Sequence, residues 1–251
     1  MSGHSKWSSI KHKKGAADAK RGKLFSKLSR AIIVAAREGG PDPAGNLALQ
    51  NAVEKARSFS MPKDNIERAI ARGAGTDSDA AAYETVVYEG YGPSGVAVMV
   101  EALTDNRNRT ASEVRHVFSK NDGNLGTSGA VAWLFERKAV VLVGSDAAEE
   151  DEVMLAAVEG GAEDVEQEGS TYRVTAALEH LAVVREALES AGFTVESAEA
   201  TMVPKTTVEV ADEATAKKIV RLIDALEEND DVQDVYANFD IPEQVLEAVA
   251  G

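Results

Sequence analysis

The spacing of apolar residues changes near residue 80, and this change constrains the fold more than any other feature. Before it, Leu24, Leu28 and Ile32 recur every four residues, which is typical of a helix with one buried face. After it, short apolar runs such as 96–103 follow glycine-rich turns, which is typical of strands. The segment 73–82, rich in Gly, Ala, Ser and Asp, predicts a linker. We therefore expect a helical domain followed by an α+β body.

The first region predicts three helices, which together make a helical domain over residues 1–80. The first helix is expected at about 16–38, because Gly39-Gly40-Pro41 would terminate it. A second is expected at 44–59. A third is expected at 62–73, since a proline such as Pro62 suits the first turn of a helix.

The body is predicted to contain an α+β domain that is split along the chain. Its first part, 81–131, has strands at 85–89 and 96–103 and a helix at 110–120, where Thr110 and Glu113 have the spacing of a capping box. Val114, Val117 and Phe118 are expected to form the buried face of that helix. Its second part, 202–240, is expected to pair with the first. The elements predicted in the second part are a strand at 203–210, a helix at 213–228 with Ile219, Ile223 and Leu226 on one face, and a strand at 233–239.

Between these two parts, residues 132–201 predict a βαββαβ series. This order of elements is that of a ferredoxin-like unit, so an inserted ferredoxin-like domain is expected. Gly169-Ser170 is expected to form the hairpin turn at its centre. The expected strands are 133–143, 163–168, 171–177 and 193–200, and the expected helices are 146–159 and 178–191. The predicted fold class is thus α+β with three domains, one inserted in another.

Charge is strongly segregated along the chain. The whole sequence carries −15, but residues 1–30 hold nine basic residues and one acid, for a local charge of +8. Residues 81–251 carry −22. Such asymmetry indicates a polyanion-binding segment joined to an acidic body, and nucleic acid is the expected polyanion.

The candidate nucleic-acid contacts are the cations of this segment and of a later turn. Lys20, Lys23, Lys27 and Arg30 are spaced so that they line one side of the first helix. Trp7 would either stack on a base or anchor the segment to the body. A targeting peptide and a merely solvated charged face are the competing interpretations of the same composition. The full candidate set is Lys6, Trp7, Lys11, His12, Lys13, Lys14, Lys20, Arg21, Lys23, Lys27, Arg30, Arg107 and Arg109.

Two glycine-rich segments have compositions found in phosphate-binding loops, but only the second keeps phosphate binding as an open interpretation. Residues 90–95 match G-x-G-x-x-G, but a strand follows them where a dinucleotide site needs a helix, so they predict a hairpin turn. Residues 123–129 are open to two interpretations: an anion-binding nest of backbone N–H groups, or a flexible connection.

Other functional classes find little support in the sequence. Cysteine is absent, the four histidines have no metal-ligand spacing, and no G-x-S-x-G elbow occurs, so neither an enzyme nor a cofactor or metal site is expected. No apolar run reaches the roughly 18 residues of a membrane span, and no secretory signal is evident. A cytoplasmic protein without a membrane partner is expected.

Several motifs over nearly the whole chain resemble those of the YebC/PmpR family, which includes mitochondrial translational activators of cytochrome oxidase subunit I. The motifs are GHSKW at 3–7, KHK at 11–13, DAKRGK at 18–23, MPKDNIERAI at 61–70, YEGYGP at 88–93 and LTDNRNRT at 103–110. The resemblance implies a helical N-terminal domain plus two α+β domains, and a probable DNA-binding transcriptional regulator. Some members of the family act on ribosomes.

One segment departs from the family pattern. Where many members carry arginines after an Asn-Pro in the second helix, this chain has NLALQ at 46–50. The second helix is therefore not expected to contact phosphate, and the first thirty residues become the main candidate.

Three functional hypotheses are compatible with the sequence. A DNA-binding transcriptional regulator and an RNA- or ribosome-binding translation activator share the same electrostatic signature, because both polymers present phosphates. The third is an acidic protein-interaction module whose α+β domains bind basic proteins.

Overall fold

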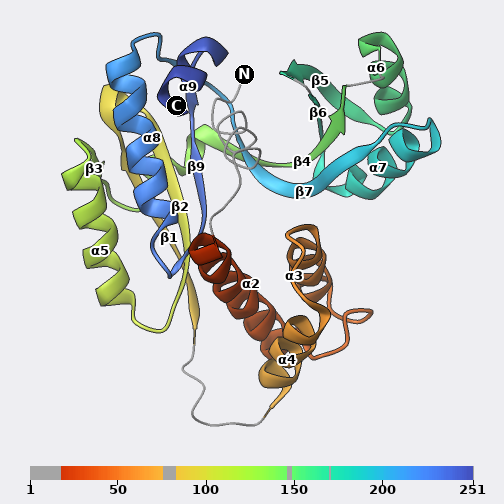
Figure 1. Ribbon diagram of the computed structural model, residues 1–251, viewed down its shortest axis with the longest axis horizontal. Coiled ribbons are helices and arrows are strands. Elements are labelled where there is room, and N and C mark those ends of the chain that lie inside the picture. The colour runs from red at the N-terminus through yellow and green to blue at the C-terminus, as the bar shows by residue number, and fades with distance from the viewer. Residues whose placement is uncertain (1–17, 76–82, 146–148, 170, 251) are drawn as a thin grey trace.

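Three groups of elements make up the fold, as the computed structural model in Figure 1 shows. The structure describes residues 18–75, 83–145, 149–169 and 171–250. The helices are α2 (Asp18–Gly39), α3 (Leu47–Ser58), α4 (Lys63–Ala74), α5 (Arg107–Lys120), α6 (Glu150–Glu159), α7 (Leu181–Ser190), α8 (Glu213–Glu227) and α9 (Glu243–Ala250), with short 3-10 turns at η1 (Pro93–Gly95), η2 (Ala132–Leu134) and η3 (Leu178–His180). The strands are β1 (Glu84–Tyr91), β2 (Ala97–Thr104), β3 (Asn124–Leu125), β4 (Phe135–Gly144), β5 (Ala162–Glu168), β6 (Thr171–Ala176), β7 (Val195–Pro204), β8 (Val208–Glu209), β9 (Val232–Ala237) and β10 (Phe239–Asp240).

The N-terminal helical domain consists of α2, α3 and α4, as the sequence predicts. Leu28 and Ile32 of the expected apolar stripe are buried against the other two helices. The second helix begins at Leu47 because the side chain of Asn46 accepts a hydrogen bond from the Leu49 N–H at 3.1 Å. Asn46 is itself buried and donates to the carbonyl oxygens of Ala35 and Gly40, so this cap also ties α3 to the end of α2.

The middle domain is a four-stranded antiparallel sheet with the strand order β3-β1-β2-β9. Helices α5 and α8 lie side by side on one face of this sheet (Figure 1). Between them and the sheet lies the largest core, which includes Phe118, Ile219 and Ile223. The pairing of β9 with β2 brings together two parts of the chain that lie on either side of the inserted strands and helices.

Two local predictions for the middle domain are wrong. No single strand covers 203–210. Residues 203 and 204 are the end of β7, and the short strand β8 pairs in parallel with β10 outside the main sheet. The capping box at Thr110 and Glu113 is absent, because α5 begins three residues earlier, with Asn106 as its cap. The Thr110 hydroxyl is used in a buried hydrogen-bond network instead.

The inserted domain has an antiparallel sheet of order β5-β6-β4-β7, with α6 and α7 packed over one of its faces (Figure 1). This is the ferredoxin-like βαββαβ arrangement expected from the sequence. The strands that enter and leave the domain, β4 and β7, are direct neighbours from the Phe135–Pro204 pair onward. The exact boundaries 1–80, 81–131 with 202–240, and 132–201 stay a proposed division. Within the described ranges, no helix is both long and apolar enough to cross a membrane.

Helices α2 and α4 approach so closely at Gly73 that a side chain there would not fit. A Cβ at Gly73 would lie 2.5 Å from the Ile33 carbonyl oxygen and 2.7 Å from the Ala36 Cβ. We expect Gly73→Ala to destabilise the helical domain by about 1–3 kcal/mol, because the backbones must separate.

The matched control is Gly22→Ala in α2, where a Cβ meets nothing within 4 Å. This change is expected to stabilise the helix by about 0.5–1 kcal/mol. Hydrogen exchange of the α2 and α4 amides measures both effects. Equal protection in the two variants would contradict the close contact.

Candidate nucleic-acid interface

The predicted nucleic-acid contacts divide into residues outside and inside the described part of the chain. Six of them lie outside it, and Lys20 and Arg21 lie in the first turn of α2. The five whose surroundings the structure describes are Lys23, Lys27, Arg30, Arg107 and Arg109. The six outside are Lys6, Trp7, Lys11, His12, Lys13 and Lys14.

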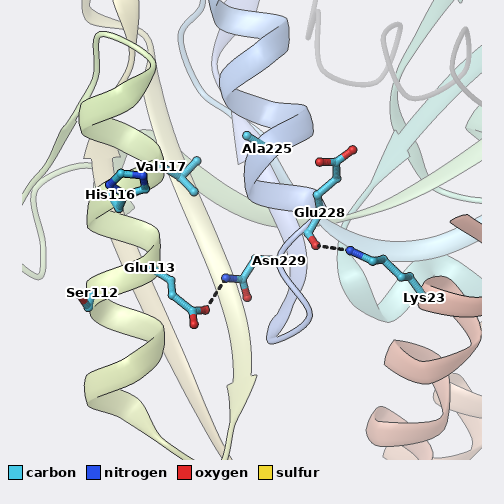
Figure 2. A pocket seen from close by; sticks show the side chains of 8 residues that line it. All are labelled: Lys23, Ser112, Glu113, His116, Val117, Ala225, Glu228 and Asn229. Atoms are coloured by element: carbon cyan, nitrogen blue, oxygen red, sulfur yellow. Dashed lines mark hydrogen bonds between the residues drawn. The ribbon is translucent and has the colours of Figure 1, made fainter.

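The basic face of α2 is turned toward the middle domain. Lys27 Nζ donates to the carbonyl oxygen of Glu227 at 2.5 Å, and Lys23 Nζ lies 3.5 Å from that of Glu228 (Figure 2). Both acceptors belong to the C-terminal end of α8, where helix carbonyls lack partners and the helix dipole favours cations. Two of the predicted phosphate contacts thus bind the end of a neighbouring helix.

Arg30 continues this contact into the loop that follows α8. Its guanidinium donates to the carbonyl oxygen of Asp230 at 2.8 Å and to Oδ1 of Asp231 at 3.0 Å. The same group lies 5.0 Å from the centre of the Tyr83 ring, within the range of a cation–π contact. Arg30 therefore connects α2 to the middle domain.

Asp231 is the centre of the network between the two domains. Its Oδ2 accepts from Arg109 at 2.7 Å and from the hydroxyl of Thr110 at 2.6 Å. Burial opposes the ionisation of this carboxyl, but the hydrogen bonds from Arg109, Thr110 and Thr104 and the charge of Arg109 hold its pKa below the ordinary 3.8. Arg30 on the other oxygen completes a buried carboxylate bound by two cations from two domains.

The two arginines of the 104–109 turn therefore differ. Arg109 binds both Asp231 and Asp105, and these two acids raise its pKa. Arg107 is exposed, and its backbone carbonyl accepts from the hydroxyl of Tyr88 at 3.3 Å. Both side chains are exposed, but the guanidinium of Arg109 is already bound by two carboxylates.

A second connection joins the helical domain to the same sheet through α3. Lys55 Nζ lies 2.7 Å from Oδ1 of Asp234 in β9. Burial lowers the pKa of Lys55, but Asp234 and Glu199 more than offset this effect, so the pKa is raised. Sequence reasoning missed this role, since a lone lysine in a helix is not distinctive.

A hollow of about 560 Å³ lies between α5, α8 and the start of α2 (Figure 2). Lys23 reaches it, but Glu113 and Glu228 also line it. Asn229 donates to Oε2 of Glu113 at 2.8 Å and thereby bridges α5 to the end of α8. With more acids than lysines in its wall, this hollow is poorly suited to phosphate.

The glycine-rich segment 123–129 does lead into an anion-binding nest, but the anion is a side chain of the protein itself. Oε1 of Glu89 accepts from the N–H of Gly129 at 2.7 Å, and Oε2 accepts from Val131 at 2.8 Å and Ala132 at 2.7 Å. Burial opposes ionisation of Glu89, yet these three bonds lower its pKa. These N–H groups are therefore not free for phosphate. The sequence signal was weak: Glu89 is an acid within a strand of mostly uncharged residues.

Similarity to known proteins covers almost the whole chain. A family profile described as the TACO1/YebC N-terminal domain matches residues 5–76, and one described as the TACO1/YebC second and third domain matches residues 83–239. Relatives called probable transcriptional regulatory protein are 63% identical over 251 residues in Rubrobacter xylanophilus and 54% identical over 251 residues in Persephonella marina; each match covers 100% of both chains. The crystal structure of a conserved hypothetical protein from Aquifex aeolicus is 54% identical, with a TM-score of 0.80 over 90% of this chain and 93% of that one.

The lowered pKa of Asp231 predicts that acid releases α2 from the middle domain. The carboxylate's contribution is fully present above its ordinary pKa of 3.8 and is lost as the pH falls through its lower folded value. Asp231→Asn is expected to cost about 1.5–3 kcal/mol of interface stability at pH 7, because charge-assisted hydrogen bonds are lost.

Hydrogen exchange of α2 and of the end of α8, corrected for intrinsic rates, checks this prediction. The neighbouring Asp230→Asn is the control, because the Asp230 side chain is 73% exposed and its ion pair with Lys23 is long, at 3.9 Å, and so contributes little. Protection that depends equally on both aspartates would show that Asp231 is not the centre of the interface.

Proposed function

Because this chain belongs to the TACO1/YebC family, we propose that it is a non-enzymatic, nucleic-acid-binding regulator of gene expression. The observation that carries the proposal is the charge of +8 over residues 1–30 beside −22 over residues 81–251. Basic clusters bind phosphate backbone with little dependence on sequence, whereas an acidic surface repels it. The acidic body then limits where the nucleic acid lies.

Within this proposal, the main phosphate contacts are the cations from Lys6 to Arg21, with the exposed Arg107 as an addition. Lys23, Lys27 and Arg30 have a secondary part, since the end of α8 and the loop after it already bind their side chains. Arg109 is likewise engaged by Asp231.

Duplex DNA is the first candidate target, in keeping with the names of the relatives in Rubrobacter and Persephonella. RNA, including that of the ribosome, is the second, and one observation favours it. The most basic helix, α2, packs its cationic face on α8 and so does not present that face to a major groove. A cytoplasmic location is part of the proposal for either target.

Salt dependence tests the phosphate contacts directly. If about six phosphates are neutralised, the affinity for DNA or RNA should fall on the order of a thousandfold between roughly 50 and 200 mM salt. Replacing Lys11, Lys13 and Lys14 by glutamine should lower the slope of log K against log salt by about 3, and the affinity at roughly 100 mM salt by on the order of a hundredfold.

The control has the same change of charge on α8: Lys217, Lys218 and Arg221, all exposed, are replaced by glutamine. This variant should keep the slope, because these residues belong to the acidic body. Binding that is independent of salt, or an equal loss in both variants, would refute the proposed interface. Filter binding or fluorescence anisotropy with duplex DNA and with RNA gives both quantities.

The level of regulation needs a separate measurement in cells. Crosslinking followed by sequencing of the bound nucleic acid distinguishes promoters from transcripts and ribosomal RNA. Sedimentation with ribosomes that is lost in the Lys11, Lys13 and Lys14 variant would support the RNA target. An association with protein that survives nuclease treatment would favour the third hypothesis, an acidic protein-interaction module.

A further inference from the structure

Two exposed aromatic side chains, Tyr91 at the end of β1 and Trp133 in η2, bind the same backbone carbonyl group. The Trp133 indole N–H donates to the carbonyl oxygen of Ala130 at 3.2 Å, and the Tyr91 hydroxyl donates to the same oxygen at 2.9 Å. Trp133 is 65% exposed and Tyr91 is 37% exposed. Both rings thus have their polar group satisfied within the protein, while much of their surface faces solvent.

The carbonyl that holds them is itself fixed by a buried carboxylate. The N–H groups of Gly129, Val131 and Ala132, on both sides of Ala130, all donate to Glu89. Glu89 is 5% exposed and comes two residues before Tyr91 on the same face of β1. One charged side chain therefore fixes the loop that orients both rings.

One apolar and one basic residue lie on or beside the elements that carry the two rings. Val87, 45% exposed, lies on the same face of β1 as Tyr91. The backbone N–H of Lys205 donates to the carbonyl oxygen of Leu134 at 2.8 Å, which places an exposed lysine beside the residue that follows Trp133. Two exposed aromatic rings whose polar atoms are held by one carbonyl, with a lysine in the adjoining segment, suit a base and its phosphate.

We propose that Trp133 and Tyr91 form a stacking platform for an unpaired nucleobase. The platform rests on the proposed function, since it assumes that the basic segment brings nucleic acid to the protein. Stacking accepts any base but requires that the base be unpaired, so the platform would favour single strands over duplexes. Glu89 is a positioning residue here, because it acts through the loop and does not touch the base.

Fluorescence of Trp133 tests the proposal. The only other tryptophan is Trp7, so all comparisons are made within a Trp7→Phe background. The probes are a single-stranded RNA of about twelve nucleotides, a duplex of the same length, and an abasic strand with the same phosphates. We expect the single-stranded RNA to quench Trp133, and the duplex and the abasic strand to leave its emission unchanged.

Affinity provides the second readout. Trp133→Leu should weaken binding of the single-stranded RNA by roughly 5- to 100-fold, the range measured for loss of one stacked base, and leave binding of the abasic strand unchanged. Leu155→Ala is the matched control. Leu155 is 66% exposed on α6, so this substitution removes exposed apolar surface at a distant position. Glu89→Gln should reduce both the quenching and the fluorescence anisotropy of Trp133, because the loop loses its charged acceptor.

The outcomes separate this proposal from the proposed function. If all three probes bind with strong salt dependence but Trp133→Leu changes nothing, the platform is refuted and the proposed function stands. If no probe binds the unaltered chain at roughly 50 mM salt, the proposed function itself fails. Quenching of Trp133 by a basic protein, without quenching by RNA, assigns the surface to a protein partner and overturns the proposal.

Discussion

The arrangement of the helical domain on the rest of the molecule depends on the carboxylate of Asp231. It is buried, and it binds Arg30 from α2 and Arg109 from α5 at the same time. A buried carboxylate without partners would cost several kcal/mol. Arg30 and Arg109 both offset that cost, so the loss of either one weakens the contact between the two domains. The neighbouring bonds of Lys23 and Lys27 to the end of α8 depend on this placement, because they require α2 to lie along that helix.

Much of the fold was predictable because it follows local periodicity. Leu28 and Ile32 identified the core of the first helix, and the alternation of strands and helices after residue 132 identified the inserted domain. The predictions failed where a distant contact outweighs a local pattern. Thr110 bonds to Asp231 rather than capping its own helix, and the 203–210 segment divides between β7 and a separate two-stranded sheet.

The candidate site shows the same limit. Clustered charge identified the basic face of α2, but it does not distinguish a cation that meets phosphate from one that binds a helix carbonyl about 200 residues away. Lys55 with Asp234 and Glu89 with its three N–H groups are also contacts of high sequence separation. Nothing in a single sequence reports such pairs, since only the folded chain brings them together.

The inserted domain joins the middle domain through β4 and β7, which are hydrogen-bonded neighbours at the point of attachment. Since the chain enters and leaves at one place, the domain is attached as a two-stranded ribbon, and the flanking residues Leu134 and Lys205 are hydrogen-bonded to each other at 2.8 Å. Such a ribbon resists stretching along its strands but bends more easily across its face. The distal helices α6 and α7 are thus held at the far end of a ribbon whose base, at Phe135 and Met202, packs against Ala97 and Met99 of the middle-domain sheet.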